Sequence, residues 1–176
     1  MHSRFVNACL QRGHPARVGL KTNAKRTFVE DKLISRLKDV LKDFKDISLD
    51  YIVEQVRGVL KNRNMKAFHV NRHIPNGYED QGAFNLIIVT AGHTLFDCVI
   101  GEEYFRYDAV AVKDIEKFQV IDGMWENKES KKSEPFLSLR LSHGDESHIA
   151  LALEDGERPS LKNLADLVLS VRNPDN

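Results

Sequence analysis

The spacing of apolar residues changes near Lys66, and this change limits what the chain can fold into. Before it, apolar residues recur every three or four positions, which is the period of an amphipathic helix. After it they recur at every second position, which is the period of a half-buried strand, until a helical period returns near the C-terminus. The sequence therefore predicts an α+β protein, with helices first, an antiparallel sheet next and one helix at the end.

Two helices are predicted before the change of period. One apolar stripe spans residues 33–44 and follows a capping box at 27–30, in which a threonine hydroxyl and a glutamate satisfy the first amide groups. A second stripe spans residues 49–60 and follows Ser48, a typical N-cap residue. Because the break between them is short, we predict an αα-hairpin over residues 27–63. Each stripe must be buried, either against the rest of the chain or against a partner.

Short strands separated by turns are predicted after the change of period. The expected strands are residues 67–71, 84–89, 95–100, 104–112, 116–121, 137–141 and 149–153. Residues 126–134 are highly charged and have nothing to bury, so they are expected to form a loop. Pro159 is placed as the first residue of a final helix, and Asn173-Pro174 ends it.

Strands at short spacing followed by one amphipathic helix resemble the bacterial members of the pleckstrin-homology-like (PH-like) superfold. The resemblance covers roughly residues 84–172. It is carried by the strand-turn-strand stretch 85–96, the Asp-Ile-Glu-Lys-Phe segment 114–118, the hairpin 137–153 and the terminal helix. It implies an antiparallel β-barrel or sandwich over residues 64–176, capped by its C-terminal helix. It also implies a role in binding proteins or lipids without catalysis, as in many members of this group.

The lipid-binding members of that group hold inositol phosphates with a basic cluster around the first β-hairpin. The corresponding turn here, Thr90-Ala91-Gly92-His93-Thr94, contains no lysine or arginine. A phosphate would find no guanidinium at this turn. We therefore do not expect phosphoinositide binding.

The net charge of zero hides an uneven distribution. Residues 1–26 contain six basic side chains and no acidic one, whereas residues 64–176 contain 12 basic and 19 acidic ones. An acidic body repels phosphate backbones and anionic lipids, so nucleic-acid binding is expected only through residues 1–26, if at all. That segment is interpreted as a disordered extension, and an organelle-targeting signal is the alternative.

Apolar runs such as residues 86–89 are far shorter than a membrane helix, so no transmembrane segment is predicted. The two cysteines lie in different contexts, Cys9 in the polar leader and Cys98 in an apolar strand. No disulfide framework is therefore expected, and a reducing, cytoplasmic location fits best.

His69 and His73 are spaced as two metal ligands on a helix would be. On a strand the same spacing places the rings about 13 Å apart, which is too far to share a metal ion. Since residues 67–71 are predicted to be a strand, both are interpreted as ordinary surface or partly buried histidines. No metal or other cofactor is predicted.

Two further groups have side chains of catalytic type. One group crowds a hairpin turn and consists of His143, Asp145, Glu146 and His148. A hairpin tip offers neither a concave site nor exclusion of water, so these residues are interpreted as a polar turn. The other is Cys98, which is expected in the core, where a raised pKa leaves a thiol inert.

The preferred surface for partner contact is the aromatic and charged stretch 102–108. Tyrosine and arginine are common interface anchors, so Tyr104, Arg106 and Tyr107 are candidate partner-binding residues if this strand lies at an exposed edge. Trp125, beside the charged loop, is a fourth candidate. Cross-strand pairing within the sheet would explain the same residues without any partner.

No glycine-rich phosphate loop, Walker pattern, Cys-x-x-Cys pair or serine-elbow motif occurs in the sequence. These observations favour a non-catalytic module that recognises a protein partner, with the αα-hairpin as a docking or homo-oligomerisation element. The alternative is a small hydrolase-like enzyme that gathers His69, His73, His93 and nearby carboxylates in one pocket.

Overall fold

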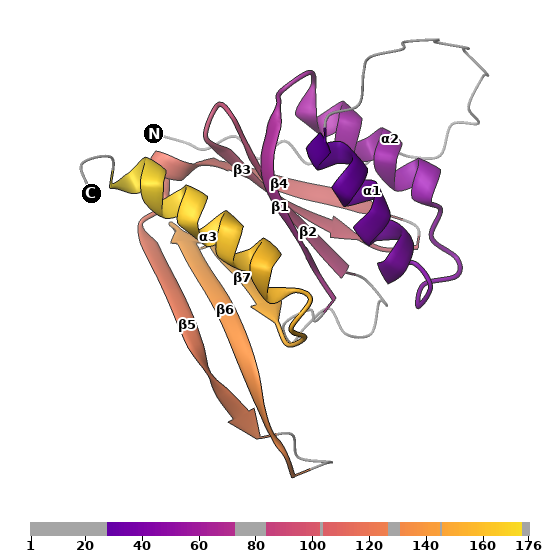
Figure 1. The fold of residues 1–176 in the computed structure, drawn as a ribbon. Coiled ribbons are helices and arrows are strands. Elements are labelled where there is room, and N and C mark those ends of the chain that lie inside the picture. The colour runs from indigo at the N-terminus through magenta and orange to yellow at the C-terminus, as the bar shows by residue number, and fades with distance from the viewer. Residues whose placement is uncertain (1–27, 73–83, 103, 127–130, 145, 174–176) are drawn as a thin grey trace, which may run out of the picture.

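The computed structural model describes residues 28–72, 84–102, 104–126, 131–144 and 146–173 (Figure 1). These residues form three α-helices and seven strands, and the strands are arranged in two antiparallel sheets. The chain is therefore of the α+β class and places a helix after its last strand, as the sequence predicts. Within this described part, no helix is long and apolar enough to cross a membrane.

Sheet A contains four strands in sequence order, and sheet B contains three. The strands of sheet A are β1 (Met65–Asn71), β2 (Phe84–Thr90), β3 (Thr94–Ile100) and β4 (Phe105–Ala111). A short 3-10 turn, η2 (Val112–Asp114), follows β4. The strands of sheet B are β5 (Lys117–Glu126), β6 (Ser133–His143) and β7 (Glu146–Ala152). Every pairing within these sheets joins consecutive strands in antiparallel orientation.

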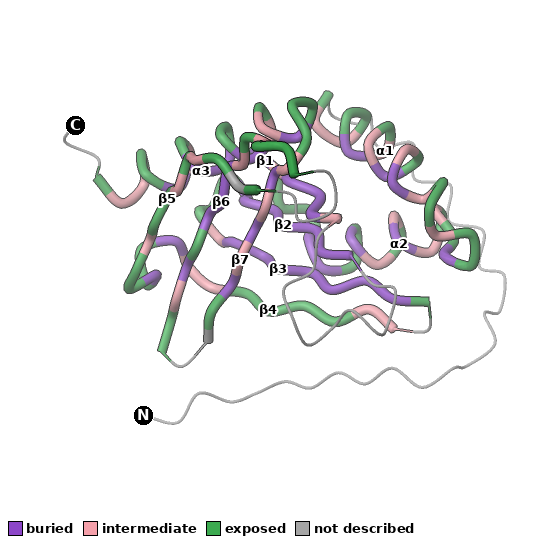
Figure 2. Tube along the Cα trace, turned by 90° about the horizontal axis from the view of Figure 1, so that it is seen from below, coloured by how far each residue is buried: buried purple, intermediate pink, exposed green. Residues whose placement is uncertain are grey.

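The inner strands of sheet A, β2 and β3, are covered on both faces. The helices α1 (Phe28–Val40) and α2 (Leu49–Leu60) lie on one face, and α3 (Arg158–Arg172) with sheet B lies on the other. All seven residues of β2 are consequently buried (Figure 2). A strand that is buried on both faces needs apolar side chains at successive positions, which explains the unbroken apolar run at residues 86–89.

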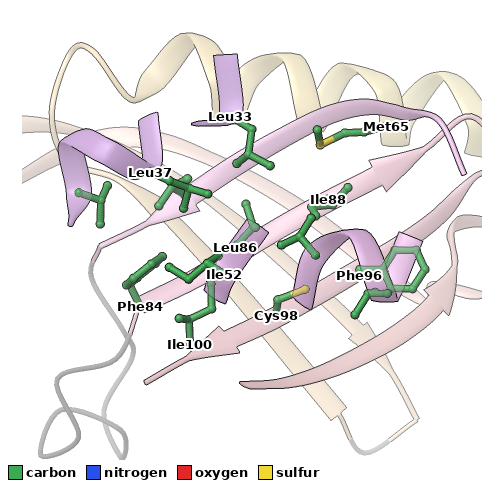
Figure 3. Close-up of a cluster of buried hydrophobic side chains, with 14 of the residues drawn as sticks. Leu33, Leu37, Ile52, Met65, Phe84, Leu86, Ile88, Phe96, Cys98 and Ile100 are labelled. Carbon is green, nitrogen blue, oxygen red and sulfur yellow. The ribbon is translucent and has the colours of Figure 1, made fainter. Parts of the chain in front are cut away.

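Alternate residues of sheet A point to two separate cores. The first core lies under α1 and α2 (Figure 3), and its members include Leu33, Leu37, Ile52, Met65, Phe84, Leu86, Ile88, Phe96, Cys98 and Ile100. The second core lies between sheet A, sheet B and α3, and its members include Ala67, Ile87, Val89, Leu95, Leu137, Leu139, Leu141, Leu161, Leu164 and Val168. The same sheet therefore organises both halves of the chain.

The first core gives α1 and α2 a partner inside the chain. The prediction that these helices act in docking or homo-oligomerisation was based on apolar stripes that had to be covered. Sheet A covers the buried residues of both stripes. The apolar stripes therefore no longer argue for an assembly role of the two helices, and that role stays a prediction.

The end of α1 differs from the prediction. The helix ends at Val40, although the apolar stripe continues to Phe44. The amides of the next residues, from Lys42 to Phe44, bond to carbonyls three positions back instead of four, which tightens the chain into turns. Leu41 and Phe44 still pack against the first core, so the apolar period marks burial beyond the end of the helix. Thr27 of the predicted capping box lies outside the described residues.

The charged stretch 126–134 was predicted to be a loop, but both of its ends belong to strands. β5 runs to Glu126 and β6 begins at Ser133, and these two residues pair with each other. Backbone hydrogen bonds continue along this long hairpin past the positions where side chains are buried. Side-chain charge is therefore a poor predictor of where the backbone hydrogen bonds between β5 and β6 end.

A buried carboxylate ties α1 to the start of α3. The Glu157 side chain is fully buried, and its Oε1 lies 2.7 Å from Arg36 Nη2. Its Oε2 accepts a hydrogen bond from the Leu153 amide at 3.3 Å. Arg72, just after β1, extends the network by donating to Asp39 Oδ2 at 3.1 Å. Since Glu157 directly precedes α3, one side chain connects the first helix of the described chain to the last.

Glu157→Ala should lower the free energy of unfolding by roughly 3 kcal/mol, because it removes the buried acceptor of Arg36 and of the Leu153 amide. Asp122→Ala is the matched control, since Asp122 is 65% exposed and pairs with Arg158 at 2.7 Å. The control should cost less than about 1 kcal/mol. Urea denaturation measures both losses. Equal losses would show that the contacts of Glu157 add nothing beyond those of a surface ion pair.

Candidate functional site

The face of sheet A that points to α3 and sheet B carries buried polar side chains among the apolar ones. They are His69, Asn71, Asn85 and Asp97. The strand register places His69, Ile87 and Asp97 in one row across β1, β2 and β3. Of these four polar residues, only His69 is named from the sequence as a candidate for metal binding or catalysis. The sequence signal for Asp97 is a polar residue at the centre of an apolar strand, whereas Asn71 and Asn85 lie near strand ends and carry no such signal.

Asp97 is the centre of a buried network between the two sheets. Its Oδ2 accepts a hydrogen bond from His148 Nδ1 of β7 at 2.7 Å, and its Oδ1 accepts one from Asn85 Nδ2 at 3.2 Å. The interpretation of His148 as part of a polar turn is wrong, because the residue lies within β7 and is only 9% exposed. His148 shares the core-facing side of β7 with Ala150 and Ala152. The network therefore fastens β7 to sheet A.

The rest of the predicted polar turn, residues 143–148, is described only in part. His143 is exposed, and its Nδ1 donates to the Asp114 carbonyl at 2.9 Å. Asp145 and the side chain of Glu146 lie outside the described residues. The interpretation as a polar turn thus agrees with His143 and is not tested by its acidic members.

His69 is fully buried, and both of its ring nitrogens have partners. Nε2 donates to the Leu151 carbonyl at 2.9 Å, and Nδ1 lies 2.9 Å from Ser160 Oγ at the start of α3. Burial is the main reason that the pKa of His69 falls to about 4; the charge of Arg36 also lowers it, while the bond to Leu151 opposes the shift. His73 lies outside the described residues. Within them, no group of three or more His, Cys, Asp or Glu side chains could hold a metal ion.

Cys98 lies in the first core with no exposed surface, as expected. Burial raises the pKa of its thiol well above the ordinary value, and the negative charges of Asp97 and Asp108 add to the shift. His93, a third candidate for chemistry, lies in the exposed turn between β2 and β3. The structure therefore places His69, His93 and Cys98 in three different environments.

The four predicted partner-binding residues do not lie on one element. Arg106 and Tyr107 lie on β4, the edge strand of sheet A, and point to opposite faces of the sheet. The Tyr104 ring packs directly over Gly101, so closely that a Cβ at position 101 would overlap it. Trp125 lies on β5 in sheet B, and its side chain is outside the described part. Only Arg106 and Tyr107 remain as neighbours on an exposed strand.

Most of β4 is exposed (Figure 2). We use the name β4 edge surface for its consecutive exposed residues Arg106, Tyr107, Asp108 and Ala109. Tyr107 is 44% exposed, yet its ring centroid lies 6.2 Å from that of Phe96 and 6.4 Å from that of Phe105. Tyr107 thus contacts two neighbouring rings and is still exposed in part, which suits a contact residue.

A second charged surface lies on α1. A surface hollow of about 520 Å³ is lined there by Lys32, Ser35, Arg36, Lys38, Asp39 and Lys42. Asp39 bonds to Lys42 Nζ at 2.8 Å and to Arg36 Nη1 at 3.0 Å. The hydrogen bond and charge of Lys42, together with nearby arginines, lower the pKa of Asp39. The hollow is a set of ion pairs on the surface of α1 and the turn that follows it, in which Arg36 and Lys42 already pair with Asp39.

Comparisons of this chain with protein-family models, with curated proteins and with solved structures find no match. The similarity to PH-like domains therefore remains a prediction from the order of the elements.

The depressed pKa of His69 gives folding a pH dependence. The unfolded chain binds a proton there near pH 6.5, whereas the folded protein binds it only near pH 4. The neutral buried ring therefore contributes stability that is fully present above pH 6.5 and lost as the pH falls toward 4. The loss amounts to about 3 kcal/mol at most.

His69→Gln should flatten this part of the pH profile. Urea denaturation of both proteins at about pH 7 and about pH 4 measures the slope. If the variant loses as much stability on acidification as the original protein, another group causes the acid sensitivity.

Proposed function

We propose that this protein is a non-catalytic interaction module that binds a protein partner by strand addition at β4. The position of β4 is the observation that carries this proposal. It is the last strand of sheet A, it pairs with β3 alone among the described strands, and four of its consecutive residues are exposed. The free edge of a strand offers N–H and C=O groups to an extended segment of another protein.

The backbone hydrogen bonds around β4 indicate which residues point to the free edge. The Gly101 amide bonds to the Tyr104 carbonyl at 3.0 Å, and the Val112 amide bonds to the His93 carbonyl at 2.9 Å. Residues of an antiparallel pair alternate between hydrogen-bonded and non-hydrogen-bonded positions. Even-numbered residues of β4 therefore bond to β3, and odd-numbered residues such as Tyr107 direct their N–H and C=O groups outward.

The side chains of the β4 edge surface support the same proposal. Arg106 and Tyr107 project from opposite faces, so they would flank an added strand on both sides. In strand addition, main-chain bonds supply affinity and the neighbouring side chains supply selectivity. Tyrosine and arginine are the residue types that most often dominate such contacts.

We also propose that residues 64–176 form a PH-like domain. Support comes from the order of four strands in one sheet, three in the next and a C-terminal helix that packs against strands of both sheets. Counting β1 extends the resemblance from residues 84–172 back to Met65. This superfold hosts many binding modules, in agreement with a role for β4 in recognition.

A small enzyme remains the alternative, and it would need several of the candidate groups in one pocket. His69 and His148 are buried and bonded to the chain's own groups, whereas His93 lies in a surface turn. This separation favours the interaction module.

A photo-crosslinking amino acid in place of Tyr107 tests strand addition in the protein's native cells. We expect adducts with a protein, and we expect Ala109→Pro to reduce them to background. Proline removes the outward amide of residue 109 without touching a bond to β3, and edge strands tolerate it at such positions.

The same probe at Gln119, an exposed residue of β5, is the matched control and should give no comparable adduct. Adducts that persist in the Ala109→Pro chain, or that form equally from Gln119, would contradict binding at β4. Thermal unfolding followed by circular dichroism verifies that the proline variant is folded.

A further inference from the structure

The charges of β4 make its edge complementary to itself. Arg106 and Asp108 lie on either side of Tyr107 and on the same face of the sheet. When a second β4 is placed antiparallel with the two Tyr107 residues opposite each other, each Arg106 stands opposite Asp108 of the second copy. A twofold axis repeats every contact, so two opposite-charge pairs form together.

The neighbouring registers lack this complementarity. An axis at Arg106 places two arginines opposite each other, and an axis at Asp108 places two aspartates opposite each other. Like charges directly opposite in a sheet are destabilising, whereas opposite charges stabilise the pair. Among these three registers, charge selects the one with its axis at Tyr107.

The backbone of β4 suits the same register. Phe105, Tyr107 and Ala109 direct their N–H and C=O groups to the free edge, so Tyr107 can exchange two hydrogen bonds with its copy and Phe105 can do so with Ala109. Arg106 and Asp108 then occupy non-hydrogen-bonded positions, where Cα atoms are about 4.5 Å apart and side chains are closest. The closest side-chain positions are thus those of the opposite charges.

We propose that the occupant of β4 is a second copy of this chain, bound antiparallel about a twofold axis at Tyr107. This inference rests on the proposed strand addition and names its partner. Sheet A of one copy continues into sheet A of the other, and the two Tyr107 rings meet on the face that carries Phe96 and Phe105. Because each copy contributes one strand edge, the contact is small and the dimer is weak.

Exchanging the two charges tests the proposal by sedimentation of the full chain over a range of concentrations. Arg106→Asp alone or Asp108→Arg alone should weaken self-association at least about tenfold, because each turns both opposite-charge pairs into like-charge pairs. The double variant restores the pairs with reversed polarity and should associate within about threefold of the original chain. Ala109→Pro should abolish association.

A chain that stays monomeric, or a double variant no better than its single parents, overturns the second-copy inference. The cross-linking at Tyr107 separates this failure from failure of the proposed function. Adducts with a different protein that Ala109→Pro removes leave strand addition at β4 standing and replace its occupant. If the original chain neither self-associates nor forms adducts, both proposals are overturned.

Disulfide formation between introduced cysteines tests the register. The native cysteines do not interfere, because Cys9 is replaced by serine (Cys9→Ser) and Cys98 is buried. Tyr107→Cys should give a disulfide-linked dimer with added diamide, because Cα atoms of a hydrogen-bonded pair lie about 5.5 Å apart, within the range of a disulfide. Ala109→Cys is the matched control, since its two copies lie about 13 Å apart in this register. A mixture of Phe105→Cys and Ala109→Cys chains should link to each other. Linking through Ala109→Cys alone, without Tyr107→Cys, overturns the register.

Discussion

The inner strands of sheet A have to be covered on both faces, and the arrangement of the other elements follows from this requirement. All seven residues of β2 are buried, so neither face can be left to solvent. The cover on one face comes from the beginning of the described chain and the cover on the other from its end. The contact between Arg36 and Glu157 lies where these two covers meet. The fold is therefore closed by a contact between segments that are far apart in sequence.

The second core is less uniform than its apolar members suggest. Asp97 bonds to His148, and His69 bonds to the Leu151 carbonyl, so both contacts run from sheet A to β7. A buried polar group that loses its partner costs more free energy than an apolar group that shifts. These contacts therefore favour a single placement of β7 over sheet A, where apolar packing alone would tolerate several. The same burial that serves this purpose keeps the two histidines away from solvent.

The change of apolar period near Lys66 predicts the fold class and the place of most elements, because burial repeats with the local geometry of helix and strand. The apolar period fails as a guide where burial and backbone hydrogen bonding end at different residues, as at the end of α1 and along the hairpin of β5 and β6. It also fails for His148, which follows a polar turn but lies inside a strand. Tyr107 and Arg106 can be proposed from their residue types. That β4 is an edge cannot, since strand order depends on contacts between distant segments.

The turn that joins β3 to β4 controls which side chains the edge displays. The Gly101 amide bonds to the Tyr104 carbonyl, and the Tyr104 ring occupies the space that a side chain at 101 would need. A turn with one residue more or fewer would exchange the faces of β4, sending Tyr107 toward sheet B and Arg106 toward the helices. Insertions in surface loops are commonly tolerated during evolution. In this loop, an insertion of one residue would change which side chains each face of β4 displays, although the amino acids of β4 would stay the same.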